Sequence, residues 1–536
     1  MNFINFLRKE AERPLQSIVL MTILAGLSSA ILLGIINAAV KTANIEEVSF
    51  NNLLLFIVTL VAFIVTEKYM LKYGVVIIEE VLGRVRNRLS KKILQADLLT
   101  LDRIGSSEIY NRMSSETAII SRSAGILVAS MQSLVMIIFV LFYIATLSLL
   151  AFGLVLGLLT LAIYLYLTNQ KKIKSELNQT NQKEVQFLNA LTDMLHGIKE
   201  LKFNFLRTED LKHDVLDISS SLKELKFSLN RKYDNNYIFA QTFFYILIAS
   251  IIFLLPKYGI TFSDTITQIV TAILFIIGPI SNVVMVVQIY NEVDIASQNI
   301  VKLEQRLDET LDFETGMADI PEIKFRNNIE LQDIEFQYYG ENGNQIFGIG
   351  PMNLKINQGE IIFIVGGNGS GKTTLMKVLS RLYNPSKGKI FIDGLEVTSS
   401  LMPSYRQLFS SVFNDFHLFV KLYGFRDISF ERVYELLRQM DLSNKTEFLK
   451  DKFSNLNLST GQRKRLALVI SILEDKPIYL FDEWAADQDF NFRECFYKEI
   501  LQQMKKNGKT IIVITHDERY FHIADKVIKL ELGKIL

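Results

Sequence analysis

The chain has 536 residues, of which 49% are hydrophobic and 21% are charged, and its mean hydropathy is +0.23. This length indicates several domains, and the high apolar share indicates that part of the chain lies in a lipid bilayer. The net charge of +1 gives no basis for nucleic-acid binding. Cys495 is the only cysteine, which excludes an internal disulfide and a cysteine-based metal site.

Six segments in the first 290 residues are long and apolar enough to cross a bilayer. They lie near residues 15–40, 51–73, 124–148, 150–168, 236–256 and 265–289. A tight turn around 148–151 joins the third to the fourth, and Gly278-Pro279 interrupts the sixth. In the second, Glu67 and Lys68 must lie near a membrane boundary or face a wet interior. The alternative, six long buried helices of a soluble protein, is disfavoured by so many apolar runs.

Basic residues predict the orientation of these spans. The loop after the second span and the loop after the fourth, residues 171–232, are rich in Lys and Arg, whereas the opposite loops are short. The positive-inside rule therefore places the N-terminus, both long loops and the C-terminal third in the cytoplasm. Residues 1–13 combine apolar and basic side chains in a pattern that favours an interfacial helix.

A boundary between two domains falls near residues 291–326. A charged helix over 291–312 is expected to continue from the sixth span, and Gly316 and Pro321 then precede a strand-like segment at 329–339. The predicted division is an interfacial segment (1–14), an all-α membrane domain (15–290), a linker (291–326) and an α/β domain (327–536).

The sequence GGNGSGKTT at 366–374 matches the P-loop pattern. The apolar run 361–365 predicts a buried strand before it, and Leu375, Val378, Leu379 and Leu382 predict a helix after it. In this setting backbone amides surround phosphates, Lys372 reaches the β- and γ-phosphates, and Thr373 ligates Mg²⁺. The chain is therefore expected to bind a nucleoside triphosphate through Gly366, Gly367, Asn368, Gly369, Ser370, Gly371, Lys372, Thr373 and Thr374.

Three further motifs follow in the same domain. An apolar strand at 478–482 ends in Asp482 and Glu483, so that one carboxylate is placed to hold Mg²⁺ and the next to act as general base. LSTGQ at 458–462 precedes a helix-like stretch. His516 follows the strand-like KTIIVIT.

LSTGQ resembles the signature of ATP-binding cassette (ABC) ATPases, and the four ordered motifs extend this resemblance over 330–536. Six spans followed by one cassette are similar to an ABC half-exporter, which implies a homodimer. The segment from RKRLALVISIL to DEWAADQDF and the segment THDERYFHIADKV more closely resemble bacterial exporters of cyclic peptides and peptide siderophores, of the syringomycin, pyoverdine and lasso-microcin type. LDRIGSSEIYNRM (101–113) and LHGIKELKFN (195–204) are similar to that family in the cytoplasmic loops.

The resemblance implies a role for each motif. Tyr338 would stack on adenine, with Tyr339 as the alternative, while Asp482 would support Mg²⁺ and Glu483 would be the general base. His516 would contact the γ-phosphate, and Ser459, Gly461 and Gln462 would cap the ATP held by a second copy. Residues 484–487 occupy the D-loop position at the dimer seam; for Trp484, simple packing is an equally good interpretation.

The chain departs from the common ABC pattern at one ligand. Where most members have a glutamine that binds Mg²⁺ and senses the membrane domain, this chain has Asn414, with Asp415 as a second candidate. Asparagine offers the same amide oxygen on a shorter side chain. KDKFSNLN also lacks the Glu-rich motif of multidrug exporters, so their coupling contacts cannot be copied to this chain.

Segments near 101–116 and 200–212 are expected to act as coupling helices, because apolar Leu101, Ile104, Phe203 and Phe205 need a packing partner. Solvated basic faces are the alternative. The polar residues within the spans line a cavity or bond neighbouring helices, and both interpretations stay open. These residues are Asn37, Gln132, Gln241, Gln268, Asn282 and Gln288.

The expected activity is ATP-driven export of a cyclic or siderophore-type peptide across the bacterial inner membrane. A lipid or multidrug exporter and a non-transporting regulatory ATPase are the alternatives. The implied cofactors are ATP and Mg²⁺, and the implied partners are a second copy, an amphiphilic substrate and the lipid bilayer, but no nucleic acid. Periplasmic or outer-membrane partners remain open.

Overall fold

The computed structural model describes residues 3–11, 16–42, 50–258, 263–309, 322–340, 344–425 and 428–536. Two compact units divide the chain. One contains Met1–Lys91 and Ser106–Arg306, and the other contains Lys92–Gly105 and Leu307–Leu536. Gly316 and Pro321 of the predicted linker lie outside the described residues, as does Arg13 of the predicted interfacial helix.

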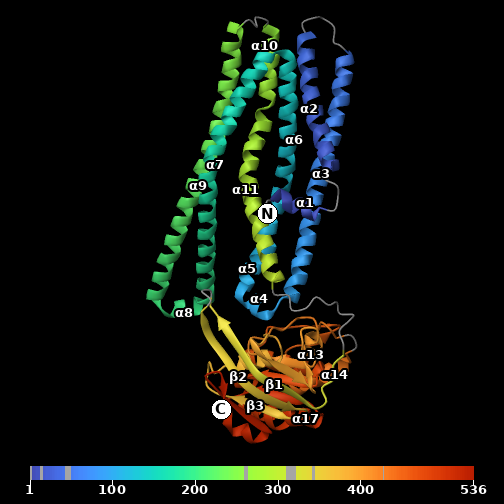
Figure 1. Cartoon of the computed structure of the whole chain (residues 1–536), viewed down its shortest axis with the longest axis vertical. Helices are drawn as coiled ribbons and strands as arrows, with labels where there is room; N and C mark the ends of the chain where they lie inside the picture. Colours follow the sequence, from blue (N-terminus) through green and yellow to red (C-terminus); the bar gives the residue numbers. More distant parts are fainter. Residues whose placement is uncertain are drawn as a thin grey trace. The chain divides into compact units, whose positions relative to one another are not determined.

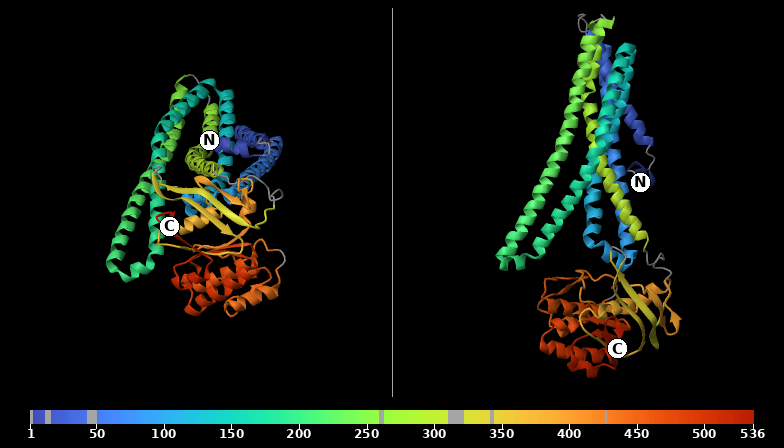
Figure 2. Two further views of the ribbon diagram at one scale, coloured as in Figure 1. Left: turned by 60° about the horizontal axis from the view of Figure 1, so that its bottom comes forward. Right: turned by 60° about the vertical axis from the view of Figure 1, so that its left-hand side comes forward.

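In its described residues, the first unit has helices and no strands (Figures 1 and 2). Six of its helical segments have the length and composition of membrane spans, which confirms the predicted all-α membrane domain. Its elements are α1 Phe3–Glu10, α2 Gln16–Thr42, α3 Phe50–Gln95, α5 Ser106–Asn111, η1 Arg112–Glu116, α6 Thr117–Leu147, α7 Leu149–His196, α8 Ile198–Phe203, α9 Phe205–Leu254, η2 Leu255–Tyr258, α10 Ser263–Phe275 and α11 Ile277–Asp308.

Two predicted interruptions of the spans are present. Ser148 ends α6 and begins α7, and its side chain accepts a hydrogen bond from the backbone N–H of Ala151. The sixth span breaks at Ile276, two residues before the predicted Gly278-Pro279. Pro279 instead lies in the first turn of α11, where a missing N–H costs no helical hydrogen bond.

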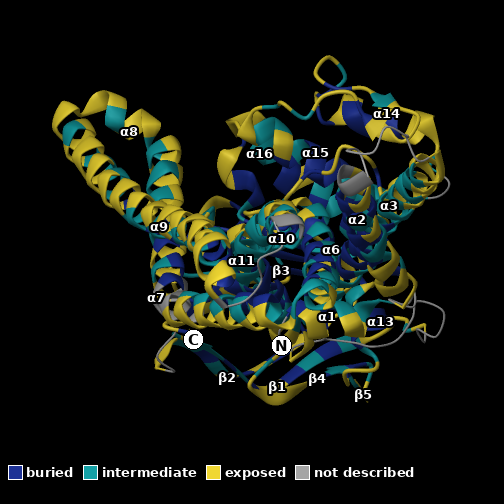
Figure 3. Ribbon diagram, turned by 90° about the horizontal axis from the view of Figure 1, so that it is seen from above, coloured by how far each residue is buried: buried dark blue, intermediate teal, exposed yellow. Residues whose placement is uncertain are grey.

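Close helix packing builds the core of this unit. α2 and α6 approach so closely that a Cβ on Gly26 would meet Val135 Cγ1 at 2.6 Å. The interior around them is aliphatic and includes Leu33, Val140 and Ile144. By contrast, most apolar side chains in the first half of α3 are exposed, as expected of a helix that faces lipid tails. Figure 3 shows these exposed helix faces in yellow.

An ion-pair cluster joins three helices of the first unit. The Arg88 guanidinium of α3 donates to Glu10 Oε2 of α1 at 2.7 Å and to Glu304 Oε1 of α11 at 2.6 Å. The backbone N–H of Phe3 also donates to Asp294 Oδ1. These contacts attach the predicted interfacial helix to the membrane helices.

The short helix α4, Leu98–Ile104, belongs to the second unit although it comes from the loop between two membrane helices. Leu98 and Leu99 pack against the core of the α/β domain, and the Tyr383 hydroxyl donates to Asp102 Oδ2 at 2.9 Å. The predicted coupling segment at 101–116 therefore begins a few residues too late. Its helix starts where the Asp97 side chain accepts from the Thr100 backbone N–H.

The rest of the second unit has two main sheets. One is antiparallel in the order β2-β1-β4-β5, and the other has the order β12-β11-β3-β10-β9-β6, with only β12 antiparallel. The strands are β1 Asn328–Tyr339, β2 Gln345–Asn357, β3 Ile361–Val365, β4 Lys387–Ile392, β5 Leu395–Glu396, β6 Phe409–Val412, β7 Phe448–Leu449, β8 Lys452–Phe453, β9 Ile478–Asp482, β10 Thr510–Ile514, β11 Lys526–Glu531 and β12 Lys534–Ile535.

Helices cover the parallel sheet on both faces, so its central strands are apolar throughout. Ile362 and Ile364 of β3 join one core, whereas Ile361 and Phe363 join the other. The helices are α12 Lys372–Leu379, α13 Met402–Arg406, α14 Phe430–Gln439, α15 Thr460–Leu473, η4 Trp484–Asp487, α16 Phe490–Cys495, η5 Phe496–Ile500, α17 Leu501–Lys506 and η6 Glu518–Ile523. Leu382, predicted to lie on α12, falls beyond its end, because Arg381 takes a left-handed backbone conformation.

Candidate nucleotide-binding site

The P-loop lies between the end of β3 and the start of α12, as its sequence predicted. Two of its glycines allow close backbone approaches. At Gly366, φ is 149° and a Cβ would meet the Leu530 carbonyl oxygen at 2.2 Å. At Gly371, φ is 99° and a Cβ would meet Ile349 at 2.5 Å. A side chain at either position would therefore distort the loop.

The loop surrounds a pocket of about 500 Å³ with its backbone amides and a buried lysine. Lys372 Nζ donates to the carbonyls of Gly366 and Gly367 at 2.9 and 3.0 Å, which holds the ammonium group over the loop. The Ser370 hydroxyl is buried and has no hydrogen-bond partner within the described residues. Phosphate oxygens would supply a partner for both groups. The pocket is lined by Phe347, Asn368, Gly369, Ser370, Gly371, Lys372, Thr373, Thr374 and Glu483.

Two oxygen ligands meet beside this pocket. The Thr373 hydroxyl donates to Asp482 Oδ2 at 2.9 Å. Burial raises the pKa of Asp482, the bond from Thr373 opposes this shift, and the nearby Glu483 charge adds to it. A hydroxyl and a carboxylate are hard oxygen donors, so these residues fit Mg²⁺. The Asn414 backbone also bonds to Asp482, whereas the Asn414 side chain is exposed.

Glu483 and His516 lie together at the ends of β9 and β10. His516 Nε2 lies 3.2 Å from Glu483 Oε1. Glu483 has a φ of 49°, an unusual value for a residue with a side chain. The buried Lys464 donates to the Glu483 carbonyl at 2.9 Å and thereby holds this conformation. Sequence reasoning missed Lys464, although its place in RKRLAL after the signature was visible.

Trp484 is fully buried beneath the site, which confirms the packing interpretation for this side chain. Its indole Nε1 donates to the Lys464 carbonyl at 2.7 Å, and its ring stacks on Phe496. The single tryptophan thus supports both Lys464 and the backbone of Glu483.

The aromatic residues at the start of the domain form a cluster. Tyr338 packs edge to face on Phe336 and Tyr383, and its hydroxyl lies 3.4 Å from the Thr374 hydroxyl. Tyr339 is exposed and bonds to Gln337 instead. Phe347, the cross-strand neighbour of Tyr338, lines the pocket and was missed by sequence reasoning. The signal was its position opposite Tyr338, which becomes visible only when β1 and β2 are paired.

The signature residues do not line the P-loop pocket of their own chain. Ser459 caps α15 and forms a capping box with Gln462. Gly461 packs against the D-loop position, since a Cβ there would meet the Asp487 carbonyl at 2.8 Å. Gln488 Nε2 donates to the Gly461 carbonyl. The signature and the residues after Glu483 therefore form one connected surface.

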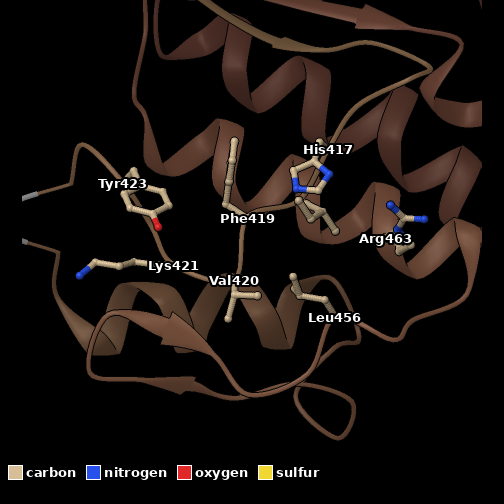
Figure 4. A pocket seen from close by; sticks show the side chains of 8 residues that line it. His417, Phe419, Val420, Lys421, Tyr423, Leu456 and Arg463 are labelled. Atoms are coloured by element: carbon tan, nitrogen blue, oxygen red, sulfur yellow. The ribbon is translucent and has the colours of Figure 1, made fainter. Parts of the chain in front are cut away.

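A second hollow of about 530 Å³ lies beside the segment that follows Asn414 (Figure 4). Its lining combines apolar and basic side chains, and Phe419, Val420 and Tyr423 are all more than half exposed. The lining residues are His417, Leu418, Phe419, Val420, Lys421, Tyr423, Leu456 and Arg463.

An α/β P-loop domain with this signature, behind a six-span helical domain, defines the class of membrane transport ATPases. The family described as "ABC transporter transmembrane region" matches residues 15–285, and the family described as "ABC transporter" matches residues 349–486. The chain therefore belongs to the ABC transporter family. It is a multi-pass, ATP-binding ATPase with the architecture of an ABC exporter half-transporter.

Individual relatives match different shares of the chain. ATP-binding protein SyrD of Pseudomonas syringae pv. syringae is 32% identical over 474 residues, which are 85% of this chain and 82% of that protein. An ATP-dependent lipid A-core flippase of Francisella tularensis subsp. tularensis is 28% identical over 277 residues, 49% of this chain and 43% of that protein. The structure titled "Structure of a bacterial Atm1-family ABC exporter with ATP bound" superposes with a TM-score of 0.76 at 18% identity, over 96% of this chain and 93% of that chain, which supports the fold.

Proposed function

We propose that this ABC exporter carries a cyclic or siderophore-type peptide out of the bacterial cytoplasm across the inner membrane. The observation that carries the peptide assignment is the resemblance of its cassette and cytoplasmic segments to exporters of such peptides. The 32% identity to SyrD, which extends over most of both chains, supports the same assignment.

The geometry of the site supports a defined role for each residue in ATP hydrolysis. Lys372 and the P-loop amides bind the phosphates, and Tyr338 or Phe347 packs against the base. Thr373 and Asp482 would hold Mg²⁺, which neutralises charge on the phosphates when bound. Glu483 accepts a proton from the attacking water, and His516, whose Nε2 lies 3.2 Å from Glu483 Oε1, orients that water.

A homodimer completes this site in the proposal. Ser459 and Gly461 lie outside the pocket of their own chain, which supports a role in capping ATP on a second copy. The hairpin formed by α7, α8 and α9 also favours a partner. Phe203 is 94% exposed at its tip and Phe205 is 78% exposed, although both face the cytoplasm in the predicted orientation.

We place this hairpin tip in the Figure 4 hollow of the second copy. The hollow offers exposed Phe419, Val420 and Tyr423, which match the apolar character of Phe203 and Phe205. It also follows Asn414 directly in the chain. A movement of the hairpin would therefore be transmitted to the proposed Mg²⁺ ligands through a short segment of the chain.

Comparative mass spectrometry of medium and cells tests the cargo. The host would express either the wild-type gene or Glu483→Gln. A cyclic or siderophore-like peptide should leave the medium and accumulate in the cells that carry the variant. An unchanged set of secreted peptides would contradict the peptide assignment.

Lipid export is the second candidate, and the lipid A-core flippase relatives favour it. Those relatives share less than half of their length with this chain, which weakens the inference. The same pair of strains distinguishes the two candidates. A lipid cargo would leave peptide secretion unchanged and alter the lipid composition of the outer leaflet.

A further inference from the structure

Three membrane helices meet around a carboxylate near the cytoplasmic end of the spans. Glu292 of α11 lies within electrostatic reach of Tyr233 on α9, and so does Tyr166 on α7. Tyr233 and Ile295 pack on the same small apolar cluster of Ile173, Leu177 and Leu229. The Tyr166 hydroxyl also donates to the Val284 carbonyl at 3.2 Å and so ties α7 to α11.

Polar groups around this point lack partners. Glu292 has no ion pair or hydrogen bond among the side chains that the structure describes. The nearby Lys232 is already paired with Glu176. The Tyr233 hydroxyl and the Asn236 side-chain amide are both buried without a hydrogen-bond partner in the described part of the chain.

The buried, unpartnered side-chain amide of Asn236 is the strongest indication that a ligand binds here. Its side chain is only 8% exposed, and a buried amide N–H without an acceptor is costly. Asn236 follows Tyr233 by three positions on α9, so the two side chains project from the same face of the helix. Gln288 precedes Glu292 by one turn on α11 and extends the polar face.

We propose that Glu292, Tyr233 and Asn236 form a subsite for an ammonium group of the cargo. Glu292 is half-buried and has no countercharge among the described side chains, and a cationic group would offset the cost of burying it. The Asn236 amide and the Tyr233 hydroxyl would donate to a carbonyl oxygen close to the cation. This combination is the chemistry of an amino-bearing peptide, so the subsite rests on the proposed function and names a feature of its cargo.

A matched pair of probes tests the charge preference. The full-length protein in lipid nanodiscs would be titrated with a dansyl-labelled cyclic heptapeptide of leucine and serine that carries one ornithine, and with its N-acetylated form. Fluorescence anisotropy should show the ammonium form bound about tenfold more tightly. Glu292→Gln should reduce this ratio below about twofold. Asn236→Leu should weaken both peptides equally, because both retain the carbonyl.

Asp234→Asn is the matched control, because Asp234 is an exposed carboxylate on α9 and should leave the ratio at about tenfold. Equal binding of the two peptides by the wild type, or an unchanged ratio in Glu292→Gln, would overturn the subsite. If the wild type binds neither peptide, the peptide cargo is wrong. In that case dansyl-dodecylamine and its acetamide replace the two peptides. The ratio of their affinities then tests whether the subsite prefers an ammonium group.

Discussion

At the scale of single residues, the hydrolysis that we propose for the site depends on Glu483 and its neighbours. Its carboxylate lies 3.2 Å from His516 Nε2, and Lys464 holds its backbone in an unusual conformation. We therefore expect Glu483→Gln to reduce ATP hydrolysis by about a hundredfold or more while ATP still binds. Phosphate release and equilibrium binding of a fluorescent ATP analogue measure the two effects. Hydrolysis at the wild-type rate would remove Glu483 from this role.

Asn414 allows a second test at the same scale. Its backbone bonds to Asp482, but its amide is exposed in the structure, so the side chain must turn inward to ligate Mg²⁺. If it does, Asn414→Gln should keep at least half of the ATPase activity, and Asn414→Ala should lower it by about tenfold or more. Measuring the Mg²⁺ dependence of ATP hydrolysis checks this. If Asn414→Ala is as active as the wild type, the Asn414 side chain does not ligate Mg²⁺, and only its backbone hydrogen bond to Asp482 contributes to the site.

At the scale of elements, α4 comes from the loop between two membrane helices but belongs to the compact unit of the cassette. Leu98 and Leu99 pack on the cassette core, and Asp102 accepts from Tyr383, whose ring packs on Tyr338. Burial, and then the bond to Asp102, raise the pKa of Tyr383, so its hydroxyl stays protonated as a donor at neutral pH. Tyr338, which we propose packs against the nucleotide base, thus lies two contacts away from Asp102 of α4.

This contact predicts that Tyr383→Phe and Asp102→Ala weaken transport more than ATP hydrolysis. The double variant should be no worse than either single variant, since each removes the same hydrogen bond, worth about 1 kcal/mol. Export per ATP hydrolysed in proteoliposomes measures the effect. Tyr110→Phe, an exposed tyrosine on α5, serves as the control. Additive losses would show that the two residues act independently.

At the scale of the whole molecule, the exposed hairpin predicts a crossed homodimer. In a Cys495→Ser background, cells would co-express a Phe203→Cys copy and a differently tagged Val420→Cys copy. A short bismaleimide should link the two copies, because the hairpin tip of one would lie in the hollow of the other. A Leu532→Cys copy replaces Val420→Cys as the control, since Leu532 is 86% exposed elsewhere on the cassette. A link formed only within single chains would contradict the crossed arrangement.

Much of the architecture was predictable because its signals are local. Six apolar runs predicted the spans, and glycines at fixed spacing before a helix predicted the P-loop. The predictions were wrong where the boundary of an element depended on contacts with distant parts of the chain. The α4 helix starts upstream of the predicted segment because Leu98 and Leu99 find their partners in the distant cassette.

The sequence by itself determined the class of this protein, because phosphate-binding motifs and membrane spans need particular residues at particular spacings. Only the tertiary structure showed that Phe347 lines the pocket, that Lys464 supports Glu483, and that Trp484 is a packed side chain. It also brought Glu292 of α11 within electrostatic reach of Tyr233 on α9, near the buried and unpartnered amide of Asn236 on the same helix as Tyr233. Such groupings depend on strand pairing and helix packing, which no local pattern encodes.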